Sequence, residues 1–434
     1  MCAALAAGAD PSAALSQSDY LAAPGNATAL PEIRRVTLDE ALRLFERHSP
    51  DLRIAREEAA AARARALSAG AFANPGLGVM REQLSDGERD YDETVLSISQ
   101  TLEIAGQRGL RRDAARRAAD AAQARLSAEQ LRLGFEVRRA FIQAAAAESR
   151  LAAFEQATEV VRQVERSGRA RFTEGDISDF ARQRLQIERA RYEDQLARAR
   201  LDLTQAGRDL ALLVSPDTFL ADGLLLPLHP LDSLAVPIPE LPPRSVQVSA
   251  AERPDVRAAG EEVEAARGRV ALAERDRIPD ITVGGGYKDQ ADGFRGGVIE
   301  LSVPLPLMDR NAGRIAEAQA DLAMAEARGA LVLRRAEADI RRAWETYQSL
   351  VQRIEEIDRD LLAGTTGLLD TARFAYAEGE MTLVELLDAA EAYRASREMA
   401  IDLLALHAIA IYDLERATGG AATDPTTPRN EEQL

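Results

Sequence analysis

The sequence predicts a mainly α-helical protein with a small β part. Three observations predict it: an internal repeat with an offset of about 204 residues, two proline-free segments of roughly 65 residues, and two pairs of short segments in which apolar and polar residues alternate. The long segments are rich in Ala, Leu, Glu and Arg, which are strong helix formers. Alternation with period two is typical of strands with two different faces.

Composition narrows the class of protein. The chain has 434 residues, of which 46% are hydrophobic and 29% charged, and this excludes a disordered chain. It has no run of 18 apolar residues, which excludes a helical membrane protein but not a β-type one. A net charge of −17 argues against nucleic acid as a partner. Cys2 is the only cysteine, and His48, His229 and His407 lack metal-ligand spacing, so we expect no disulfide, metal site or cofactor.

The internal repeat divides the chain into two units. At the common offset Pro50 lies over Pro254 and Gly175 over Gly379, with many matched charged and apolar residues between them. The sequence therefore predicts five segments: an N-terminal tether (1–35), a first repeat (36–216), a proline-rich connector (217–244), a second repeat (245–418) and a disordered tail (419–434).

Both repeats have the same order of elements. In the first, Thr37 and Glu40 have the spacing of a capping box, and a helix follows to about Ala69. A β-hairpin comes next, then a long helix, a glycine turn and a returning helix. The expected hairpins are 77–102 and 281–303, the long helices are 107–171 and 311–377, and the returning helices end near Val214 and Ala417.

The N-terminus does not have the form of a complete signal peptide. Met1–Asp10 has neither a charged segment nor a long apolar one, so we expect a start that is incomplete or already processed. Cys2, at the head of a small-residue tether, is a candidate lipid anchor. The alternative is a chance cysteine in a disordered tail.

Four strands cannot close a barrel, and an open sheet edge in lipid leaves backbone groups unpaired. Three chains with four strands each would supply twelve strands of bilayer-spanning length. Ile281, Val283 and Tyr287 alternate with small or polar residues, as do Ile299, Leu301 and Val303, which suits a barrel with an apolar exterior. An ordinary antiparallel sheet that caps a coiled coil predicts a similar pattern.

The two turn segments, Arg171–Ile177 and Arg373–Ala389, resemble those of the TolC-type outer membrane efflux channels, as does the duplicated order of elements from Arg35 to Thr418. Leu102–Arg108 and the Arg-rich segment after it are similar to the cobalt-zinc-cadmium resistance branch. The resemblance implies a homotrimer in the bacterial outer membrane. Its duplicated long-helix hairpins would form an α-helical barrel across the periplasm, below a trimeric 12-stranded transmembrane β-barrel.

The resemblance also implies a gate at the periplasmic tips. Acidic positions that match Glu385 and Asp388 line the closed entrance in the family, and Tyr376 matches a tyrosine that helps to hold neighbouring helices shut. Six carboxylates around one axis would favour cations. Met381 departs from the best-known member of the family, which has an arginine in this latch, so different gate bonds are expected. The alternative is that Glu385 and Asp388 are solvated helix charges.

The two glycine turns are the expected contact with a periplasmic adaptor (membrane fusion protein). Phenylalanines at these turns could equally be core residues that close them. The candidate contact residues, three from each turn, are Arg171, Phe172, Gly175, Arg373, Phe374 and Gly379.

The resulting hypothesis is an outer membrane channel of a tripartite efflux system with an inner-membrane RND pump. It would conduct substrates passively, with heavy-metal cations favoured, and would touch outer membrane lipid. The sequence shows no convincing combination of a nucleophile and a base, so an enzyme is not expected. The alternatives are an outlet for drug efflux or type I protein secretion, and a soluble periplasmic coiled-coil scaffold.

Overall fold

The structure is a computed structural model. It describes residues 33–85, 88, 90–214, 224–228, 231, 246–356 and 359–420. Most of the predicted tether, connector and tail lie outside the described residues, and so do Cys2 and His229.

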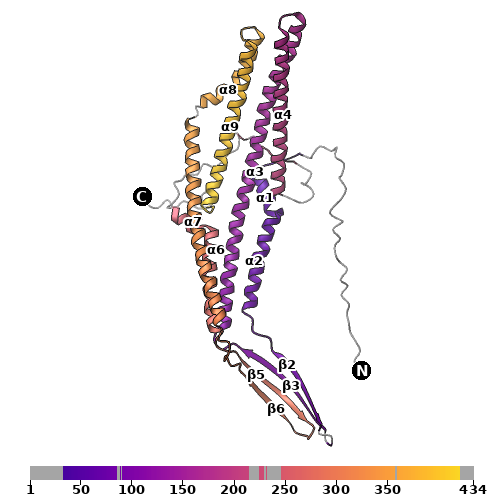
Figure 1. Ribbon diagram of the computed structural model, residues 1–434, viewed down its shortest axis with the longest axis vertical. Helices are drawn as coiled ribbons and strands as arrows, with labels where there is room; N and C mark the ends of the chain where they lie inside the picture. The colour runs from indigo at the N-terminus through magenta and orange to yellow at the C-terminus, as the bar shows by residue number, and fades with distance from the viewer. Residues whose placement is uncertain are drawn as a thin grey trace.

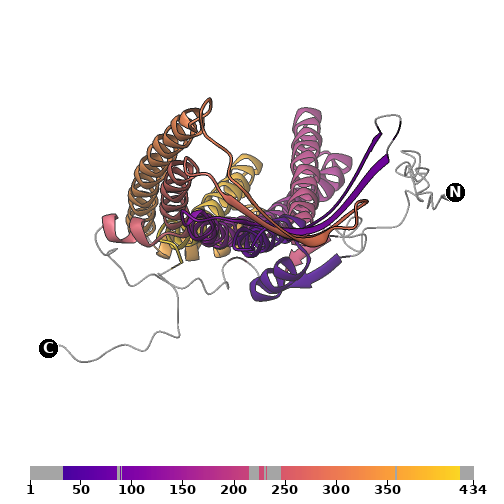
Figure 2. The same ribbon diagram turned by 90° about the horizontal axis from the view of Figure 1, so that it is seen from below.

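The molecule is elongated, with a β-sheet at one end and two helical tips at the other (Figure 1). Helix α3 (Gln107–Glu174) runs through the whole helical part. Along its first half pack α2 (Pro50–Ala69) and α6 (Pro254–Arg275), and α7 (Ala312–Glu356) packs on α6 and α9. Along its second half pack α4 (Asp179–Val214) and α9 (Leu383–Ala417), and α8 (Arg359–Ala377) packs on α9. Seen from the sheet end, the long helices form a curved layer (Figure 2). The predicted mainly α-helical fold class is confirmed.

The first helix of each repeat differs from the prediction, because each is two helices. α1 (Leu38–His48) ends at Ser49, whose hydroxyl accepts a hydrogen bond from Leu52 N–H and so caps α2. Pro50 then occupies the first turn of α2, where its missing N–H costs nothing. The second repeat has the same break, between α5 (Val246–Glu252) and α6. The predicted capping box at Thr37 is half formed, since Thr37 accepts from Glu40 N–H while the Glu40 carboxylate pairs with Arg34.

The second long helix is described as two helices rather than one. α7 ends at Glu356 and α8 begins at Arg359, and residues 357–358 lie outside the described part. Its counterpart α3 is continuous over 68 residues.

The β-sheet joins the two repeats. Its strands are β2 (Gly76–Ser85), β3 (Asp90–Leu102), β5 (Ile281–Gln290) and β6 (Arg295–Ser302), all antiparallel in the order β2-β3-β5-β6. The two predicted hairpins therefore lie side by side through β3 and β5. β2 and β6 are the edges, with no strand beyond them in the described chain.

The pairing register gives the sheet two different faces. One face carries large apolar side chains that are exposed in the single chain: Leu77 lies beside Ile98, and Val283 beside Leu301. The opposite face carries mostly glycine, serine, threonine and charged residues, among them the Lys288–Glu93 ion pair of 2.6 Å, with Met80, Leu84 and Val298 among the apolar exceptions. A Cβ on Gly286 would lie 2.6 Å from the Leu96 carbonyl oxygen, so this position requires glycine.

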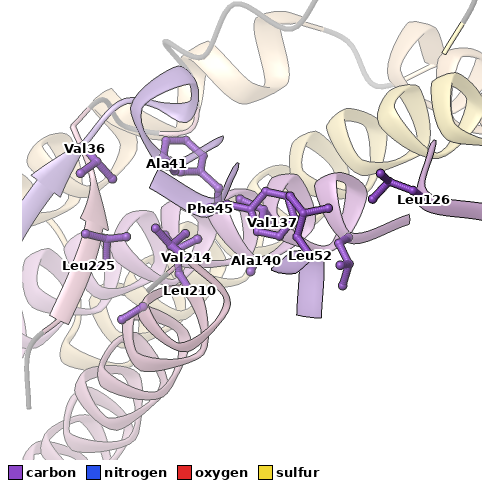
Figure 3. Close-up of a cluster of buried hydrophobic side chains, with 14 of the residues drawn as sticks. Val36, Ala41, Phe45, Leu52, Leu126, Val137, Ala140, Leu210, Val214 and Leu225 are labelled. Atoms are coloured by element: carbon purple, nitrogen blue, oxygen red, sulfur yellow. The ribbon is translucent and has the colours of Figure 1, made fainter. Parts of the chain in front are cut away.

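A second, two-stranded sheet was not predicted. β1 (Ile33–Val36) and β4 (Leu224–Pro227) pair in parallel and lie next to α1 (Figure 3). Around them α1, α3 and α4 bury a core that contains Phe45, Val137 and Leu210 (Figure 3). β1 crosses the boundary between the predicted tether and first repeat, and β4 lies in the predicted proline-rich connector, where no strand was expected.

Among the described residues, no helix meets the length and apolarity needed to cross a bilayer. The same part of the chain contains no group of three or more His, Cys, Asp or Glu side chains placed to hold a metal ion.

Candidate gate and adaptor-contact tips

The two helical tips are the turn from α3 to α4 and the turn from α8 to α9, each with the adjoining ends of its helices. They lie at the end of the molecule farthest from the sheet (Figure 1). In the first tip α3 ends at Gly175, which has a φ of 87°, and in the second α8 ends before Gly379, with a φ of 79°. Both values lie in the left-handed region, which glycine adopts without steric cost. The same backbone turn therefore ends both outgoing helices.

Hydrogen bonds align the two turns residue by residue. Asp176 N–H donates to the Arg171 carbonyl (2.8 Å), and Glu380 N–H donates to the Ala375 carbonyl (2.9 Å). Arg171 therefore corresponds to Ala375, at an offset of 204. Phe172 corresponds to Tyr376 by the same rule. The similar pair Arg373-Phe374 lies two residues earlier in its turn.

The phenylalanines of both tips are accessible. Phe172 is 37% exposed, with the Arg182 guanidinium 5.1 Å from its ring centre, and Phe374 is 68% exposed. Arg171 and Arg373 are also exposed, and Arg373 lies 3.9 Å from Asp370. Apolar rings beside arginines at a helical end are able to pack against another protein.

Glu385 is part of a helix cap. Its carboxylate accepts hydrogen bonds from the N–H (2.8 Å) and hydroxyl (2.7 Å) of Thr382, and Thr382 Oγ1 accepts from Glu385 N–H. These contacts complete a capping box at the start of α9. Bonds from the Thr382 backbone and hydroxyl lower the pKa of Glu385, so it is held as an anion.

Asp388 lies one turn further along α9 and is exposed, with no ion pair in the described chain. The opposite side of α9 is buried through Leu386, Leu387 and Ala390. Both acidic side chains therefore extend from the surface of α9, three residues apart.

Tyr376 and Met381 lie beneath this surface. Both are partly buried against the apolar cluster that fills the space between the two tips, which includes Leu185 and Leu369. Met381 therefore contributes apolar packing at this position, where an arginine would contribute hydrogen bonds.

An ionic network between α3 and α4 was not predicted. Glu165 is buried, its carboxylate pairs with Arg169, and Arg189 reaches it from α4 (3.5 Å). Arg162 of α3 and Glu193 of α4 form a further pair of 3.2 Å. Charged residues three or four apart are common in this chain, so the spacing alone does not distinguish the buried carboxylate.

Two tyrosines connect the tips to each other. Tyr192 of α4 donates to Glu391 of α9 (3.4 Å), and Tyr393 of α9 donates to Gln156 of α3. Burial, together with Glu391, raises the pKa of Tyr192 to about 12, so its hydroxyl remains protonated. Arg394 pairs with Glu391 and lowers the pKa of that carboxylate.

Open grooves lie along the helices. One groove of about 1200 Å³ lies between α2, α3, α6 and α7 and is lined by alanines together with arginines and carboxylates. No arrangement of a nucleophile and a base is found there.

The sequence matches the family model described as outer membrane efflux protein, at residues 41–215 and 246–420. The cobalt-zinc-cadmium resistance protein CzcC of Cupriavidus metallidurans is 25% identical over 363 residues, which cover 82% of this chain and 83% of the relative.

Solved structures share the fold. A membrane protein from Pseudomonas aeruginosa has a TM-score of 0.75 at 22% identity, and covers 90% of this chain and 92% of its own. The outer membrane protein VceC of Vibrio cholerae has a TM-score of 0.70 at 22% identity, covering 88% and 96%. The family model matches both halves of the chain, and together the matched residues make up most of its length. This chain therefore belongs to the outer membrane efflux protein family.

Proposed function

We propose that three copies of this chain form the outer membrane channel of a tripartite efflux system. The observation that carries the proposal is the sheet, which has two open edges, one apolar face and one small or polar face. In lipid the edges must be paired, and pairing β6 of one chain with β2 of the next closes a twelve-stranded ring. The helical layer then continues the channel into the periplasm.

The corresponding division of the chain is two repeats, 36–216 and 245–418, joined by the connector 217–244. The tether 1–35 and the tail 419–434 flank them. Cys2 lies outside the described residues, and its proposed role is a lipid anchor.

The proposed gate is a ring of carboxylates at the tips. Each chain would contribute Glu385 and Asp388 from the exposed side of α9, and Tyr376 would support the ring from beneath. The capping box keeps Glu385 ionised and fixes its position. Fixed negative charge around a narrow entrance favours cations.

The proposed adaptor contact is the outer end of both tips. Gly175 and Gly379 form the turns, and Phe172 and Phe374 are exposed beside them. A helical adaptor hairpin that presents apolar residues and carboxylates would match these rings and the neighbouring Arg171 and Arg373.

The proposed cargo is a heavy-metal cation, handed over by an inner-membrane RND pump and its adaptor. The curated relative is named for resistance to cobalt, zinc and cadmium, and an anionic gate suits such ions. An outlet for drugs or for type I protein secretion uses the same fold. Metal tolerance and drug tolerance of a strain that lacks its own channel, with and without this protein and its pump, would decide between these cargoes.

The assembly is tested first by the molar mass in detergent, measured by light scattering with the detergent contribution subtracted. We expect the mass of three chains in the outer membrane fraction. A monomer or dimer that is soluble without detergent would contradict the proposal and favour the scaffold alternative.

The gate is tested by ion selectivity in planar bilayers. Replacing both Glu385→Gln and Asp388→Asn should lower the cation-to-anion permeability ratio. Glu46→Gln, on α1 and far from the tips, is the matched control and should leave it unchanged. An unaltered ratio in the double variant would refute the ring.

A further inference from the structure

An exposed apolar stripe continues beyond the end of the sheet. On β6, Ile299 and Leu301 belong to the apolar face, and after the last paired residue the sequence continues with Val303, Leu305 and Leu307, which alternate with prolines outside regular strand structure. Leu305 is 73% exposed and Leu307 71% exposed. Pro304 and Pro306 separate Val303, Leu305 and Leu307, and prolines lack the N–H needed for a strand ladder.

Other segments add apolar side chains at the same junction between the sheet and the helices. Phe72, after α2, is 72% exposed and lies under the Arg108 guanidinium, 3.6 Å from the ring centre. Ile104, in the turn two residues after β3, is 55% exposed. Three separate connections thus place apolar groups in solvent at one level of the molecule.

The apolar face of the paired sheet is shorter than the apolar band of an outer membrane protein. On β3 this face extends from Leu96 to Leu102, because the next row outward carries the Arg81–Asp92 and Asp289–Arg295 ion pairs. Six residue steps correspond to about 20 Å along a strand and to about 15 Å of height at a tilt of roughly 40°. The apolar band of an outer membrane protein is about 25 Å tall.

The junction supplies much of the missing height. The row of Leu96 crosses β6 at Gly297, and from there to Leu305 is eight residue steps, or about 20 Å of height at the same tilt. Leu307 follows after a turn in which its N–H donates to the Leu305 carbonyl (2.8 Å). Pairing with a second chain would occur in the plane of the sheet and would leave this outward face uncovered.

We infer that phospholipid acyl chains of the inner leaflet cover Leu305, Leu307 and Phe72, so that the lipid-facing band ends in the sheet-to-helix junction rather than at the last strand pair. The inference rests on the outer membrane location. Three carboxylates of the junction have partners within the chain: Glu103 pairs with Arg111 (2.7 Å), Asp280 accepts from the Gln107 amide (3.1 Å), and Asp309 accepts from Asn311 N–H (2.8 Å).

The test uses tryptophan fluorescence, since Trp344 is the only tryptophan in the chain. In a Trp344→Phe background, single tryptophans are introduced as Leu305→Trp and Leu307→Trp, with Ile299→Trp in the sheet as the lipid-facing control. Ser302→Trp, on the opposite face, is the matched control that does not face lipid. Each trimer is placed in phosphatidylcholine vesicles with ordinary or brominated acyl chains.

We expect brominated lipid to reduce the emission of Leu305→Trp, Leu307→Trp and Ile299→Trp at least twofold, with little change for Ser302→Trp. If Ile299→Trp is quenched while both junction variants behave like Ser302→Trp, protein covers the junction and the inference is wrong. If Ile299→Trp is not quenched, the membrane location fails and the inference fails with it. Two junction positions protect the result against one that misfolds.

Discussion

The two tips share one backbone and differ in what fills them. At the offset of 204 set by the turns, Glu165 corresponds to Leu369, and both are buried. The first tip is joined by ion pairs between its helices, Arg189–Glu165 and Arg162–Glu193, and the second by apolar packing of Leu369, Leu386 and their neighbours. Among the described side chains, no ion pair joins α8 to α9. The glycine turn therefore sets the shape of each tip, whether the contacts between its two helices are ionic or apolar.

The tips also differ in surface charge. The positions that correspond to Glu385 and Asp388 are Ala181 and Arg184 in the first tip. Both carboxylates of the proposed ring therefore come from the second repeat. The two tips differ in charge although their glycine turns have the same backbone conformation.

The largest effect is expected from the feature that the tips share. Gly175→Val and Gly379→Val each force a β-branched residue into the left-handed region, and each should lower stability by about 2 kcal/mol, measured by thermal unfolding in detergent. Gly260→Val is the control, because Gly260 lies inside α6 with open space around an added Cβ. It should stay within about 0.5 kcal/mol of the parent protein. A clear difference between the two turn variants would mean that the turns are not equivalent.

The next largest effect is expected at Glu165, where the ionic contacts of the first tip can be compared with the apolar packing of the second. Glu165→Ala should destabilise by about 1–2 kcal/mol, since it leaves a cavity and unpairs two arginines that are partly open to water. Glu165→Leu gives the first tip the residue of the second, and should be neutral or stabilising because Arg169 and Arg189 can turn to solvent. Thermal unfolding distinguishes the two variants. If Glu165→Leu is the more damaging, the ionic network is essential to the first tip.

The helix caps should give a smaller difference. Thr382→Ala removes a reciprocal capping box and should cost about 1 kcal/mol. Ser178→Ala removes the single bond to Ala181 N–H (3.2 Å) and should cost less. Because the pKa of Glu385 is lowered in the folded protein, its stabilising contribution is present above the pKa of the unfolded chain, near 4.3, and disappears as the pH falls. Thr382→Ala should reduce the loss of stability at acidic pH, measured by thermal unfolding. If stability depends on pH in the same way in the variant and the parent protein, the cap does not lower the pKa of Glu385.

The smallest effect concerns the contact between the tips. The pKa of Tyr192 is raised to about 12, so its contribution is present below pH 10 and is lost as the pH rises towards 12. Tyr192→Phe should lower stability slightly at neutral pH, where the Glu391 bond is lost, and should weaken the decline above pH 10. Melting temperatures from pH 8 to 11.5 measure both. Equal slopes in the two proteins would mean that Tyr192 is not the group responsible.

Several elements could be predicted because local signals determine them. The glycine turns, the length of α3 and the strand alternation depend on neighbouring residues alone, through left-handed backbone, helix propensity and period-two patterning. The break at Ser49 was also locally encoded, by a serine cap before Pro50, and the prediction of one continuous helix was wrong.

The remaining features required the folded chain. β1 and β4 are four residues each and nearly 190 residues apart, so neither carries a signal until they pair. The burial of Glu165 depends on α4 lying against α3, and the apolar role of Met381 on the cluster between the tips. The positions of the turns, the strand alternation and the long helices could be predicted because they follow from contacts within a few residues. The burial or exposure of each carboxylate could not, because solvation depends on neighbours that are distant in sequence.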